Sequence, residues 1–404
     1  MVVVGAGPAG IAAAITAKRA GLSVLVVDKA TFPRDKCCGD GLTTGALRTL
    51  EALGLDLATV PSCTPVDGAW VRSPNGRVVE FPFPRGRGLF GAVAPRLELD
   101  AALVELARAN GVEVLDGRAL LSARQGAHFA TLSIAGIGER TARFVVGADG
   151  MWSPLRKMLG LAEPGYLGEW HAFRQYAHGV TGTAAQRLWV WFEPDLLPGY
   201  AWSFPLPDGR VNVGFGVLRD GRRRIADMKD VWPELLSRPH IAEALGPDAV
   251  FEGRHLAWPI PARIDRALSG AGRVLFVGDA VAATDALTGE GIGQALQTGI
   301  AAADSIARAD DAGPAAVQRA YRKALDDELG ADHRMSVQLG RILAHRRGAE
   351  GSLRLAGLTD WTRRNFGRWL FEDEPRAVLF TPRRWHRRLL DRDGAYRSAR
   401  PPSG

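Results

Sequence analysis

The 404-residue sequence predicts an α/β protein in which one α/β unit is interrupted by a β-sheet domain and followed by helices. Three observations support this fold class. The chain opens with a β-branched run, a glycine-rich turn and an alanine-rich stretch. Residues 65–93 and 166–269 consist of short aromatic runs separated by Pro and Gly, as in strands joined by turns. From about residue 312 the pattern is helical.

The first element is a buried parallel strand over Val2–Val4, followed by the glycine spacing GxGxxG. Gly5 permits the tight turn, Gly7 lets backbone approach a pyrophosphate, and Gly10 permits close packing of helix on strand. A helix is expected over residues 11–20, ending at Gly21. The sequence therefore predicts a Rossmann-like dinucleotide site that also includes Pro8 and Ala9, with a phosphate at the helix N-terminus.

A second strand, residues 22–27, ends at Asp28, eighteen residues after Gly10. A carboxylate at this distance can accept both hydroxyls of an adenosine ribose, and Lys29 beside it is assigned to the same site. The alternative is a glycine-rich turn in another βαβ unit, with Asp28 as a surface charge. This stretch alone does not distinguish FAD from NAD.

The composition, 46% hydrophobic and 24% charged, is that of a globular protein large enough for two or three domains. Three cysteines make no disulfide framework, and no apolar run reaches the roughly 20 residues of a membrane span. The N-terminus lacks the basic start of a signal peptide. A cytoplasmic protein is expected, with no metal site.

The net charge of +7 is concentrated in residues 331–404, which hold sixteen Arg and eight acidic residues. The rest of the chain holds 35 basic and 36 acidic residues. One interpretation is a solvated helical face, and the other is peripheral contact with an anionic membrane. No nucleic-acid-binding motif accompanies this charge, so nucleic acid is not an expected partner.

The loop after Asp28 reads FPRDKCCGDGL and leads into a helix carrying Leu47, Leu50 and Leu53. This loop resembles the signature that follows the second strand in the geranylgeranyl reductase family of flavoproteins, which includes actinobacterial menaquinone reductases. The matching residues are Arg34, Lys36, Cys38, Gly39, Gly41 and Leu42. Cys37 departs from the proline common in such relatives.

The resemblance implies an aromatic-hydroxylase type of fold in which Arg34 contacts FAD and Cys38 with Gly39 lies near the flavin ring. Gly41 belongs to the same site. Cys38 has an alternative role as a small buried residue of a tight loop. The neighbouring Cys37 and Cys38 also allow a strained vicinal disulfide, which is not favoured.

Two later segments complete the resemblance to flavoproteins. Arg96 begins a helix whose first residue lies against FAD in the family. The run from Asp149 and Gly150 to Ser153 and Arg156 resembles the second fingerprint of flavin monooxygenases. A strand end would present the carboxylate of Asp149 to the cofactor, before a helix capped by Ser153 with Pro154 in the first turn.

A third Rossmann-type strand, residues 273–280, leads to Gly278 and Asp279. Asp279 can accept hydroxyls of a ribityl chain, and the N–H groups of Gly291 and Ile292 face where reduced flavin develops negative charge. This arrangement, with Gly289, favours FAD over NAD. Against the family pattern, Ala282 replaces a usual glycine and Ala286 a usual proline.

The run from Tyr200 to Pro205 resembles the YxWxFP pattern that lines the cavity beside the flavin in geranylgeranyl reductases. Flavin halogenases place WxWxIP there. Tyr200 and Trp202 lie two apart on a strand and share a face, which gives a flat apolar wall for an isoprenoid, extended by Phe204. The alternative is a hydrophobic sheet face packed on its neighbours, the role assigned to Trp189 and Trp191.

His171, Arg174 and Tyr176 are assigned to one face of a strand, as candidates to hold a polar head group. A structural role for all three is the alternative.

The helical end of the chain interleaves apolar side chains with arginines, a pattern typical of helices that lie on membranes. In the family this region closes the lipid cavity, and packing on the β-sheet domain is the alternative. The apolar residues are Leu358, Trp361, Phe366, Trp369, Leu370 and Phe371, and the basic ones are Arg363, Arg364 and Arg368. The final RSARPPSG is expected to be disordered.

The sequence and this resemblance therefore predict an FAD-dependent reductase that saturates C=C bonds of a polyprenyl chain, either of a geranylgeranyl lipid or of the menaquinone side chain, by hydride transfer from reduced flavin. Tyr200, Trp202 and Cys38 are the candidate catalytic residues, and Tyr200 or Cys38 is the candidate proton donor. NADPH and ferredoxin both remain open as electron donor. The alternatives are an oxygen- and NAD(P)H-dependent flavin monooxygenase or halogenase, and a non-enzymatic prenyl-lipid-binding protein.

The expected domains are discontinuous. The FAD-binding domain takes residues 1–64, 95–165 and 270–311, the substrate domain takes 65–94 and 166–269, and a helical region with a basic tail takes 312–404.

Overall fold

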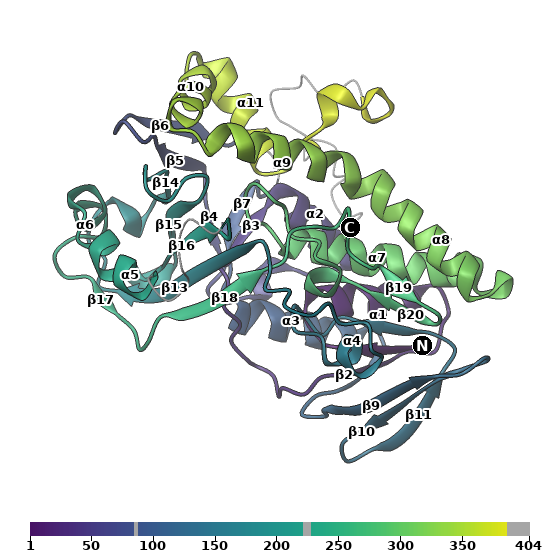
Figure 1. The fold of residues 1–404 in the computed structure, drawn as a ribbon. Helices are drawn as coiled ribbons and strands as arrows, with labels where there is room; N and C mark the ends of the chain where they lie inside the picture. Colours follow the sequence, from purple (N-terminus) through teal and green to yellow (C-terminus); the bar gives the residue numbers. More distant parts are fainter. Residues whose placement is uncertain (85–87, 221–227, 386–404) are drawn as a thin grey trace, which may run out of the picture.

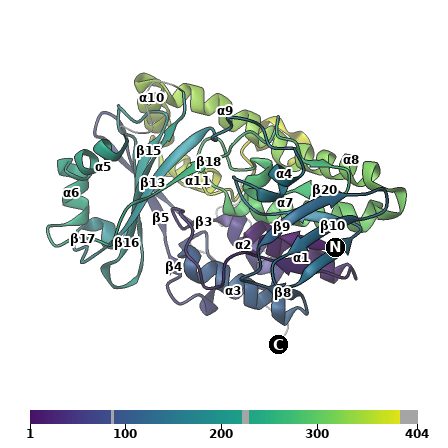
Figure 2. The same cartoon turned by 60° about the horizontal axis from the view of Figure 1, so that its bottom comes forward.

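The computed structural model describes residues 1–84, 88–220 and 228–385. Figure 1 shows two large sheets side by side, with helices near the C-terminus running across the top of both. Figure 2, turned by 60°, keeps the helices α5 (Met228–Leu236) and α6 (Pro239–Leu245) at one end and the N-terminus at the other. The mixed α/β architecture confirms the predicted fold class.

The first sheet has six strands in the order β19-β20-β12-β1-β2-β8. Five are parallel, and β19 pairs antiparallel at one edge. The strands are β1 Val2–Val4, β2 Leu25–Val27, β8 Glu113–Leu115, β12 Val145–Gly147, β19 Gly270–Ala271 and β20 Val274–Phe276. Their mostly apolar composition suits a parallel sheet buried on both faces. The sheet is assembled from stretches far apart in the sequence.

Helix α1 (Pro8–Arg19) begins three residues before the predicted start, because Pro8 occupies its first turn, where a fixed φ suits a helix. It packs on α7 (Ile292–Ala309) along small side chains. A Cβ on Gly299 of α7 would lie 2.1 Å from the carbonyl oxygen of Ala9. The two backbones are therefore in direct contact, which fixes α7 against the glycine-rich turn.

Three more helices belong to this part of the chain. Helix α2 (Thr44–Leu53) packs on α7, α3 (Arg96–Ala109) packs on α1 and β8, and α4 (Pro154–Met158) follows β12. The predicted start of α3 at Arg96 and the predicted Ser153 cap of α4 are both confirmed, since Ser153 Oγ accepts a hydrogen bond from Arg156 N. These helices bring three polar segments to one edge of the sheet.

The second sheet has the path β17-β13-β16-β15-β14-β5-β6, and β18 also pairs with β13. Its strands are β5 Gly68–Arg72, β6 Val78–Pro82, β13 Trp170–His178, β14 Leu188–Trp191, β15 Tyr200–Pro205, β16 Val211–Leu218, β17 Val250–Phe251 and β18 Leu256–Ile260. All its pairings are antiparallel except β14 with β5. One face packs on α5 and α6, where Trp189 and Trp191 stack as the predicted core pair.

Residues 228–245 correct the prediction of strand-like patterning over 166–269, because they form α5 and α6. Met228, Trp232 and Leu235 are buried at helical spacing. Two small sheets were also missed. They comprise β3 Gly41–Thr43, β4 Thr64–Pro65 and β7 Gly91–Val93, and β9 Leu120–Gln125, β10 Ala130–Ile134 and β11 Gly138–Ala142. The mostly exposed β9 and β11 lack a clear apolar alternation.

The C-terminal region is helical as predicted, with α8 (Pro314–Leu325), α9 (Ala331–Leu343), α10 (Arg346–Ala356) and α11 (Asp360–Leu370). A single π-helical turn, Asp326–Gly330, joins α8 to α9. In the described part of the chain, no helix has the length and apolar character needed to cross a bilayer. The expected disorder of RSARPPSG concerns residues outside the described ranges.

The contact between α1 and α7 gives a direct test. Gly299→Ala should lower the free energy of unfolding by about 1–3 kcal/mol, because the added methyl group cannot be accommodated beside Ala9. Gly340→Ala in α9 is the matched control, since no heavy atom lies within 4 Å of its added Cβ. The control should be neutral or stabilising by up to about 1 kcal/mol. Equal stability of the two variants in urea unfolding would contradict the packing.

Candidate functional site

The glycine-rich turn forms one end of a large cavity. Gly5 has φ +107°, and a Cβ there would lie 2.3 Å from the oxygen of Ala148, so only glycine fits. Gly7 precedes α1, and no side chain caps the first N–H groups of the helix. A Cβ on Gly7 would face the guanidinium groups of Arg34 at 3.6 Å and Arg96 at 4.0 Å. A helix N-terminus flanked by two cations is suited to bind a pyrophosphate.

The two arginines share one buried counter-ion. Arg96 Nε and Nη2 donate to the two oxygens of Asp100, both at 2.7 Å. Arg34 Nη1 lies 2.7 Å from Asp100 Oδ2 but finds no hydrogen-bond partner among the described residues, although it is buried. Burial disfavours the charged form of Arg96, but Asp100 raises the pKa of Arg96 above its usual range. Two cations and one anion leave a positive charge for a phosphate oxygen to neutralise.

Asp28 lies at the end of β2 and lines the same cavity. Its Oδ2 accepts from Ala6 N at 2.7 Å and its Oδ1 accepts from Ala30 N at 2.8 Å. Each oxygen keeps a further lone pair for a ribose hydroxyl. The ribose contact remains a prediction.

The carboxylate of Asp149 is bound within the chain, and its contact with the cofactor stays a prediction. Its Oδ1 accepts from Ser153 Oγ at 2.7 Å and its Oδ2 from Leu155 N at 2.8 Å, so the carboxylate is turned toward the start of α4. Burial, only partly offset by these bonds, raises its pKa. Asp149 lines the cavity, but its carboxylate holds the helix start in place.

Asp279 follows β20 and pairs with Lys36 Nζ at 2.9 Å. Burial opposes ionisation of this carboxyl, but Lys36 holds the pKa of Asp279 below its usual range. The ion pair connects the loop after β2 to the loop after β20. A ribityl chain near Asp279 would therefore meet both an acceptor and a donor.

The loop of residues 35–41 lies between the two large sheets and is held by a buried carboxylate. Asp40 Oδ2 accepts from Tyr176 Oη at 2.5 Å and from Asn212 Nδ2 at 2.7 Å, and Oδ1 accepts from Arg96 N at 3.3 Å. The carbonyl of Asp40 accepts from Ala94 N. Burial, partly offset by Tyr176 and its other partners, raises the pKa of Asp40 to about 6.

Arg174 of β13 binds the same loop of residues 35–41. Its guanidinium donates to both oxygens of Asp35, at 2.9 and 3.0 Å, and to the carbonyls of Lys36 and Cys38. Asn212 also donates to the Cys38 carbonyl at 2.8 Å. Arg174 therefore positions the loop, although it also borders the cavity.

His171 corrects the predicted grouping with Arg174 and Tyr176. Side chains alternate along a strand, so His171 lies on the opposite face of β13, with Phe173. Its Nδ1 is 3.0 Å from Arg219 Nη2. Burial and then Arg219 lower its pKa to about 4. His171 is outside the cavity lining.

Tyr200, Trp202 and Phe204 of β15 form an aromatic wall over the loop of residues 35–41. The ring centroids of Tyr200 and Trp202 lie 6.1 Å apart, and those of Trp202 and Phe204 6.2 Å apart. All three line the cavity, whereas Pro205 falls on the other face of the strand, which corrects its predicted substrate contact. A Cβ on Gly41 would lie 3.1 Å from the Phe204 ring, so this glycine admits the ring beside the loop.

The polar atoms of the wall are occupied. Tyr200 Oη donates to the Thr288 carbonyl, and Trp202 Nε1 donates to Asn212 Oδ1 at 3.1 Å. Burial raises the pKa of Tyr200, so its hydroxyl stays protonated. The rings therefore present apolar faces to the cavity.

Cys38 lies in the loop beneath this wall, and burial raises the pKa of its thiol. The three cysteines are free thiols, so the vicinal disulfide is absent from the described chain. The thiol stays neutral, and its sulfur accepts a hydrogen bond from Asp40 N at 3.3 Å.

One continuous cavity of about 1050 Å³ joins the glycine-rich turn to the aromatic wall. The predicted site residues that line it are Gly5, Gly7, Pro8, Ala9, Asp28, Lys29, Arg34, Cys38, Gly39, Gly41, Arg96, Asp149, Gly150, Arg174, Tyr200, Trp202, Phe204, Gly278, Asp279, Gly289, Gly291 and Ile292. Gly10 is outside the lining, because its Cβ position is filled by the Gly5 carbonyl.

The far end of the cavity is apolar and is covered by the C-terminal helices. Val71, Leu188 and Val190 line it from the second sheet. Leu339, Leu343, Leu353, Phe366, Trp369, Leu370 and Phe371 line it from the C-terminal region. Phe366 and Phe371 also pack on Phe81 and Phe83. Phe366 and Phe371 therefore pack on the second sheet as well as lining the cavity, and closure over a lipid stays a prediction. Of the predicted apolar set, only Leu358 and Trp361 are exposed.

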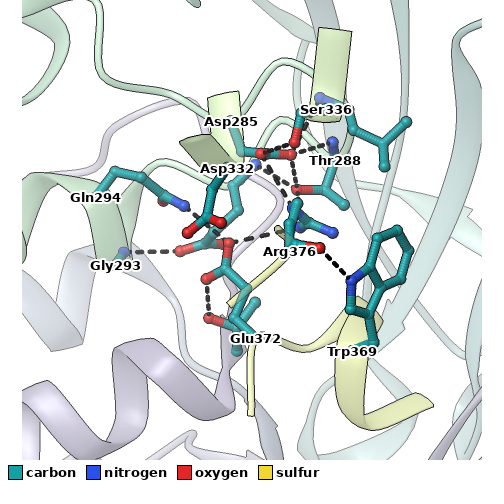
Figure 3. Close-up of polar contacts among 12 residues, drawn as sticks. Asp285, Thr288, Gly293, Gln294, Asp332, Ser336, Trp369, Glu372 and Arg376 are labelled. Carbon is teal, nitrogen blue, oxygen red and sulfur yellow. Dashed lines mark hydrogen bonds and ion pairs between the residues drawn. The ribbon is translucent and has the colours of Figure 1, made fainter. Parts of the chain in front are cut away.

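The segment after α11 is anchored at the loop that precedes α7, as Figure 3 shows. Arg376 Nε pairs with Asp285 Oδ2 at 3.1 Å, and Arg376 Nη2 lies 3.5 Å from Glu372 Oε1. Ser336 Oγ donates to the same Asp285 oxygen at 2.6 Å, and Gln294 Nε2 donates to Glu372 at 2.8 Å. This buried cluster ties the cover of the apolar end to the loop of Gly289 and Gly291.

Burial sets the titration of this cluster. It opposes ionisation of Asp285, but Arg376 holds the pKa of Asp285 below its usual range. Burial and then Glu372 raise the pKa of Glu290, which lines the cavity. Sequence reasoning missed Asp40, Asn212, Glu290 and Arg376. The one signal for them was a polar residue inside an apolar run, as at Asn212 in NVGFG.

Residues 1–323 match the family described as FAD binding domain. The chain is 33% identical over 369 residues to a menaquinone reductase of Mycobacterium tuberculosis, covering 85% of this chain and 83% of the relative. It is 28% identical over 352 residues to a digeranylgeranylglycerophospholipid reductase of Methanopyrus kandleri, covering 85% and 86%.

Two solved structures share the fold. A geranylgeranyl bacteriochlorophyll reductase-like protein of Thermoplasma acidophilum has a TM-score of 0.77 at 21% identity, covering 89% of this chain and 91% of the other. The halogenase PltM in complex with phloroglucinol and FAD has a TM-score of 0.71 at 17% identity, covering 94% and 83%. The predicted FAD-binding unit is confirmed. The helix start without a capping side chain, and the two arginines that share the one carboxylate of Asp100, are features that the pyrophosphate of FAD fits.

Arg34→Gln should weaken FAD binding about 10- to 100-fold, because one charge-assisted bond contributes roughly 1.5–3 kcal/mol. Titration of the apoprotein with FAD, followed by flavin fluorescence, measures this change. Arg108→Gln, which removes an exposed arginine at the other end of α3, is the control and should bind FAD as the unaltered protein does. Unchanged affinity in Arg34→Gln would contradict the assignment of the pyrophosphate position.

Proposed function

The chain belongs to the family of FAD-binding reductases that includes menaquinone reductase, and from this premise we propose that it saturates C=C bonds of a polyprenyl lipid. This membership confirms the resemblance drawn from residues 32–42 and 200–205. The relatives from Mycobacterium tuberculosis and Methanopyrus kandleri are both named as reductases, one of menaquinone and one of a digeranylgeranylglycerophospholipid.

The continuous cavity carries the proposal. It joins an end suited to a dinucleotide with an end lined by apolar and aromatic side chains. A flavin bound at the dinucleotide end would extend toward Cys38, Tyr200 and Trp202. An apolar chain in the aromatic end would approach the flavin beside these three residues. FAD, when bound and reduced, supplies a hydride.

The protein contributes orientation and exclusion of water. An isolated C=C bond has no polar group to be held by hydrogen bonds, so its position depends on the shape of the cavity. The faces of Tyr200, Trp202 and Phe204 hold the chain by contact, and aromatic faces stabilise positive charge on carbon during the reaction. Trp202 is fixed in place by Asn212 and by Gly214, whose Cβ position lies 2.3 Å from the indole ring.

Cys38 is the better candidate for the proton donor. Its thiol stays protonated, and no hydrogen bond in which it donates is found in the described part of the chain. The hydroxyl of Tyr200 is committed to the Thr288 carbonyl. We propose that Tyr200 is mainly a wall residue and that Arg174 positions the loop of Cys38.

We propose that the protein is cytoplasmic and makes peripheral contact with an anionic membrane through the corner between α10 and α11. Leu355, Leu358 and Trp361, here called the apolar corner, are 66%, 59% and 59% exposed. Arg354 lies next to Leu355 in the last turn of α10. The corner lies beside the helices that cover the apolar end of the cavity, so a lipid would pass from membrane to cavity without crossing water.

The proposed division of the chain follows the two large sheets. Residues 1–64, 95–165 and 270–311 would form the FAD-binding domain, residues 65–94 and 166–269 the substrate domain, and residues 312–404 the C-terminal helical region with its basic tail.

The function is tested by mass spectrometry of lipids from a host that expresses the protein. A polyprenyl species should gain two hydrogens per saturated bond. The gain should be lost in Tyr200→Phe/Trp202→Ala, because the chain is no longer held against the flavin. Phe129→Ala, which removes an exposed aromatic residue on the small β9–β11 sheet, is the control and should keep the gain. Flavin absorbance of each variant confirms folding.

A product that gains oxygen or a halogen, with prenyl chains unchanged, would contradict the reductase and favour a monooxygenase or halogenase. A protein that binds prenyl lipid without flavin would favour the binding protein.

Membrane contact is tested with vesicles of phosphatidylglycerol and of phosphatidylcholine. The protein should sediment with the anionic vesicles. Leu358→Ser/Trp361→Ser should reduce this binding at least about tenfold, since burying each apolar side chain contributes roughly 1.5–3 kcal/mol. Phe129→Ala is again the control. Equal binding by the two variants, or equal binding to both lipids, would contradict the proposal.

A further inference from the structure

A second, smaller hollow of about 240 Å³ lies beside the apolar end of the main cavity. One side is the turn between β5 and β6, with Ser73, Asn75 and Arg77. The other side is α10, with Arg347, Glu350 and Arg354 among its lining residues. Figure 1 shows α10 beside β5 and β6 at the edge of the second sheet.

The lining is positively charged. It contains three arginines and one carboxylate, and Glu350 is already bound by Arg346 Nε at 2.8 Å. Within the described ranges, the side chains of Arg77, Arg347 and Arg354 make no hydrogen bond or ion pair. Arg77, Arg347 and Arg354 are exposed at the rim of the hollow, and with Glu350 they leave it a net positive charge that an anion would neutralise.

Ser73 is a second, independent sign of a ligand. The residue is 2% exposed, and its Oγ is buried with no partner among the described residues. Burying a hydroxyl without a hydrogen bond costs stability. Because Ser73 lines the hollow, a bound oxygen atom could accept its hydrogen bond.

The hollow lies next to the main cavity. Val71 lines the main cavity from β5, and Ser73 lies two residues further along, on the same side of the extended chain. Ser73 N bonds to the Arg77 carbonyl at 2.8 Å, which keeps the turn in line with the strand pair. Leu353 of α10 lines both spaces, so one ligand could reach from the main cavity past this side chain into the hollow.

We propose that this hollow binds a phosphate-bearing head group of the polyprenyl substrate while the chain occupies the main cavity. The inference rests on the proposed function and narrows its substrate to an anionic prenyl lipid. Arg77, Arg347 and Arg354 hold the phosphate oxygens, and Ser73 donates one hydrogen bond. A neutral head group would leave all three arginines without a partner.

The test compares ligands that share a chain and differ in the head group. Geranylgeranyl diphosphate, geranylgeraniol and inorganic pyrophosphate are titrated into the FAD-loaded full chain, and quenching of tryptophan fluorescence is followed, since Trp202 and Trp369 line the cavity. The diphosphate should bind roughly tenfold or more tightly than the alcohol. Inorganic pyrophosphate, titrated in competition, should bind much more weakly than the prenyl diphosphate.

Two variants isolate the hollow. Arg347→Gln/Arg354→Gln should abolish the preference for the diphosphate and leave the affinity for geranylgeraniol unchanged, and Ser73→Ala should reduce the preference in part. Arg124→Gln/Arg140→Gln removes two exposed arginines of the β9–β11 sheet and should leave every affinity unchanged.

Equal binding of diphosphate and alcohol, or a preference that survives in Arg347→Gln/Arg354→Gln, would overturn the head-group site while leaving the proposed reductase intact. Pyrophosphate that binds as tightly as the prenyl diphosphate would mean a free-phosphate site and would also overturn it. Failure to bind either prenyl ligand would instead contradict the proposed function itself.

Discussion

The buried carboxylate of Asp40 is the interaction on which the arrangement of the site depends. It accepts hydrogen bonds from Tyr176 and Asn212 in the second sheet and from Arg96 N at the start of α3. Its backbone is held by Ala94. The Asp40 side chain thus connects the dinucleotide end of the cavity to the aromatic wall. A substitution of Asp40 would change the distance between the flavin site and the site of the prenyl chain.

The other contacts extend this connection in both directions. Lys36 and Asp279 join the loop of Asp40 to the strand that follows the inserted sheet. Arg376 joins the helices that cover the apolar end to the loop before α7. The cavity is therefore bounded by segments from the first forty residues, the middle and the end of the chain. Its apolar end excludes water where an isolated C=C bond would have to be held.

Local patterns made the dinucleotide end predictable, because the spacing around Gly5 and the start of a helix at Arg96 depend on residues close in sequence. The polar network was not predictable, since Asp40 meets its partners across more than a hundred residues. Arg376 lies beyond residues 1–323, which match the FAD binding domain family. His171 and Arg174 are three residues apart on β13, so the alternation of side chains along the strand places them on opposite faces, and their grouping on one face was wrong.

The central claim is that a prenyl chain reaches reduced FAD inside one cavity. The most direct measurement is the reoxidation of chemically reduced, protein-bound FAD after addition of a polyprenyl lipid under strict exclusion of oxygen, followed by flavin absorbance and by the mass of the lipid. The account predicts that absorbance of oxidised flavin returns as the lipid gains two hydrogens per flavin. Flavin that stays reduced until oxygen is admitted, with the lipid unchanged, would contradict it.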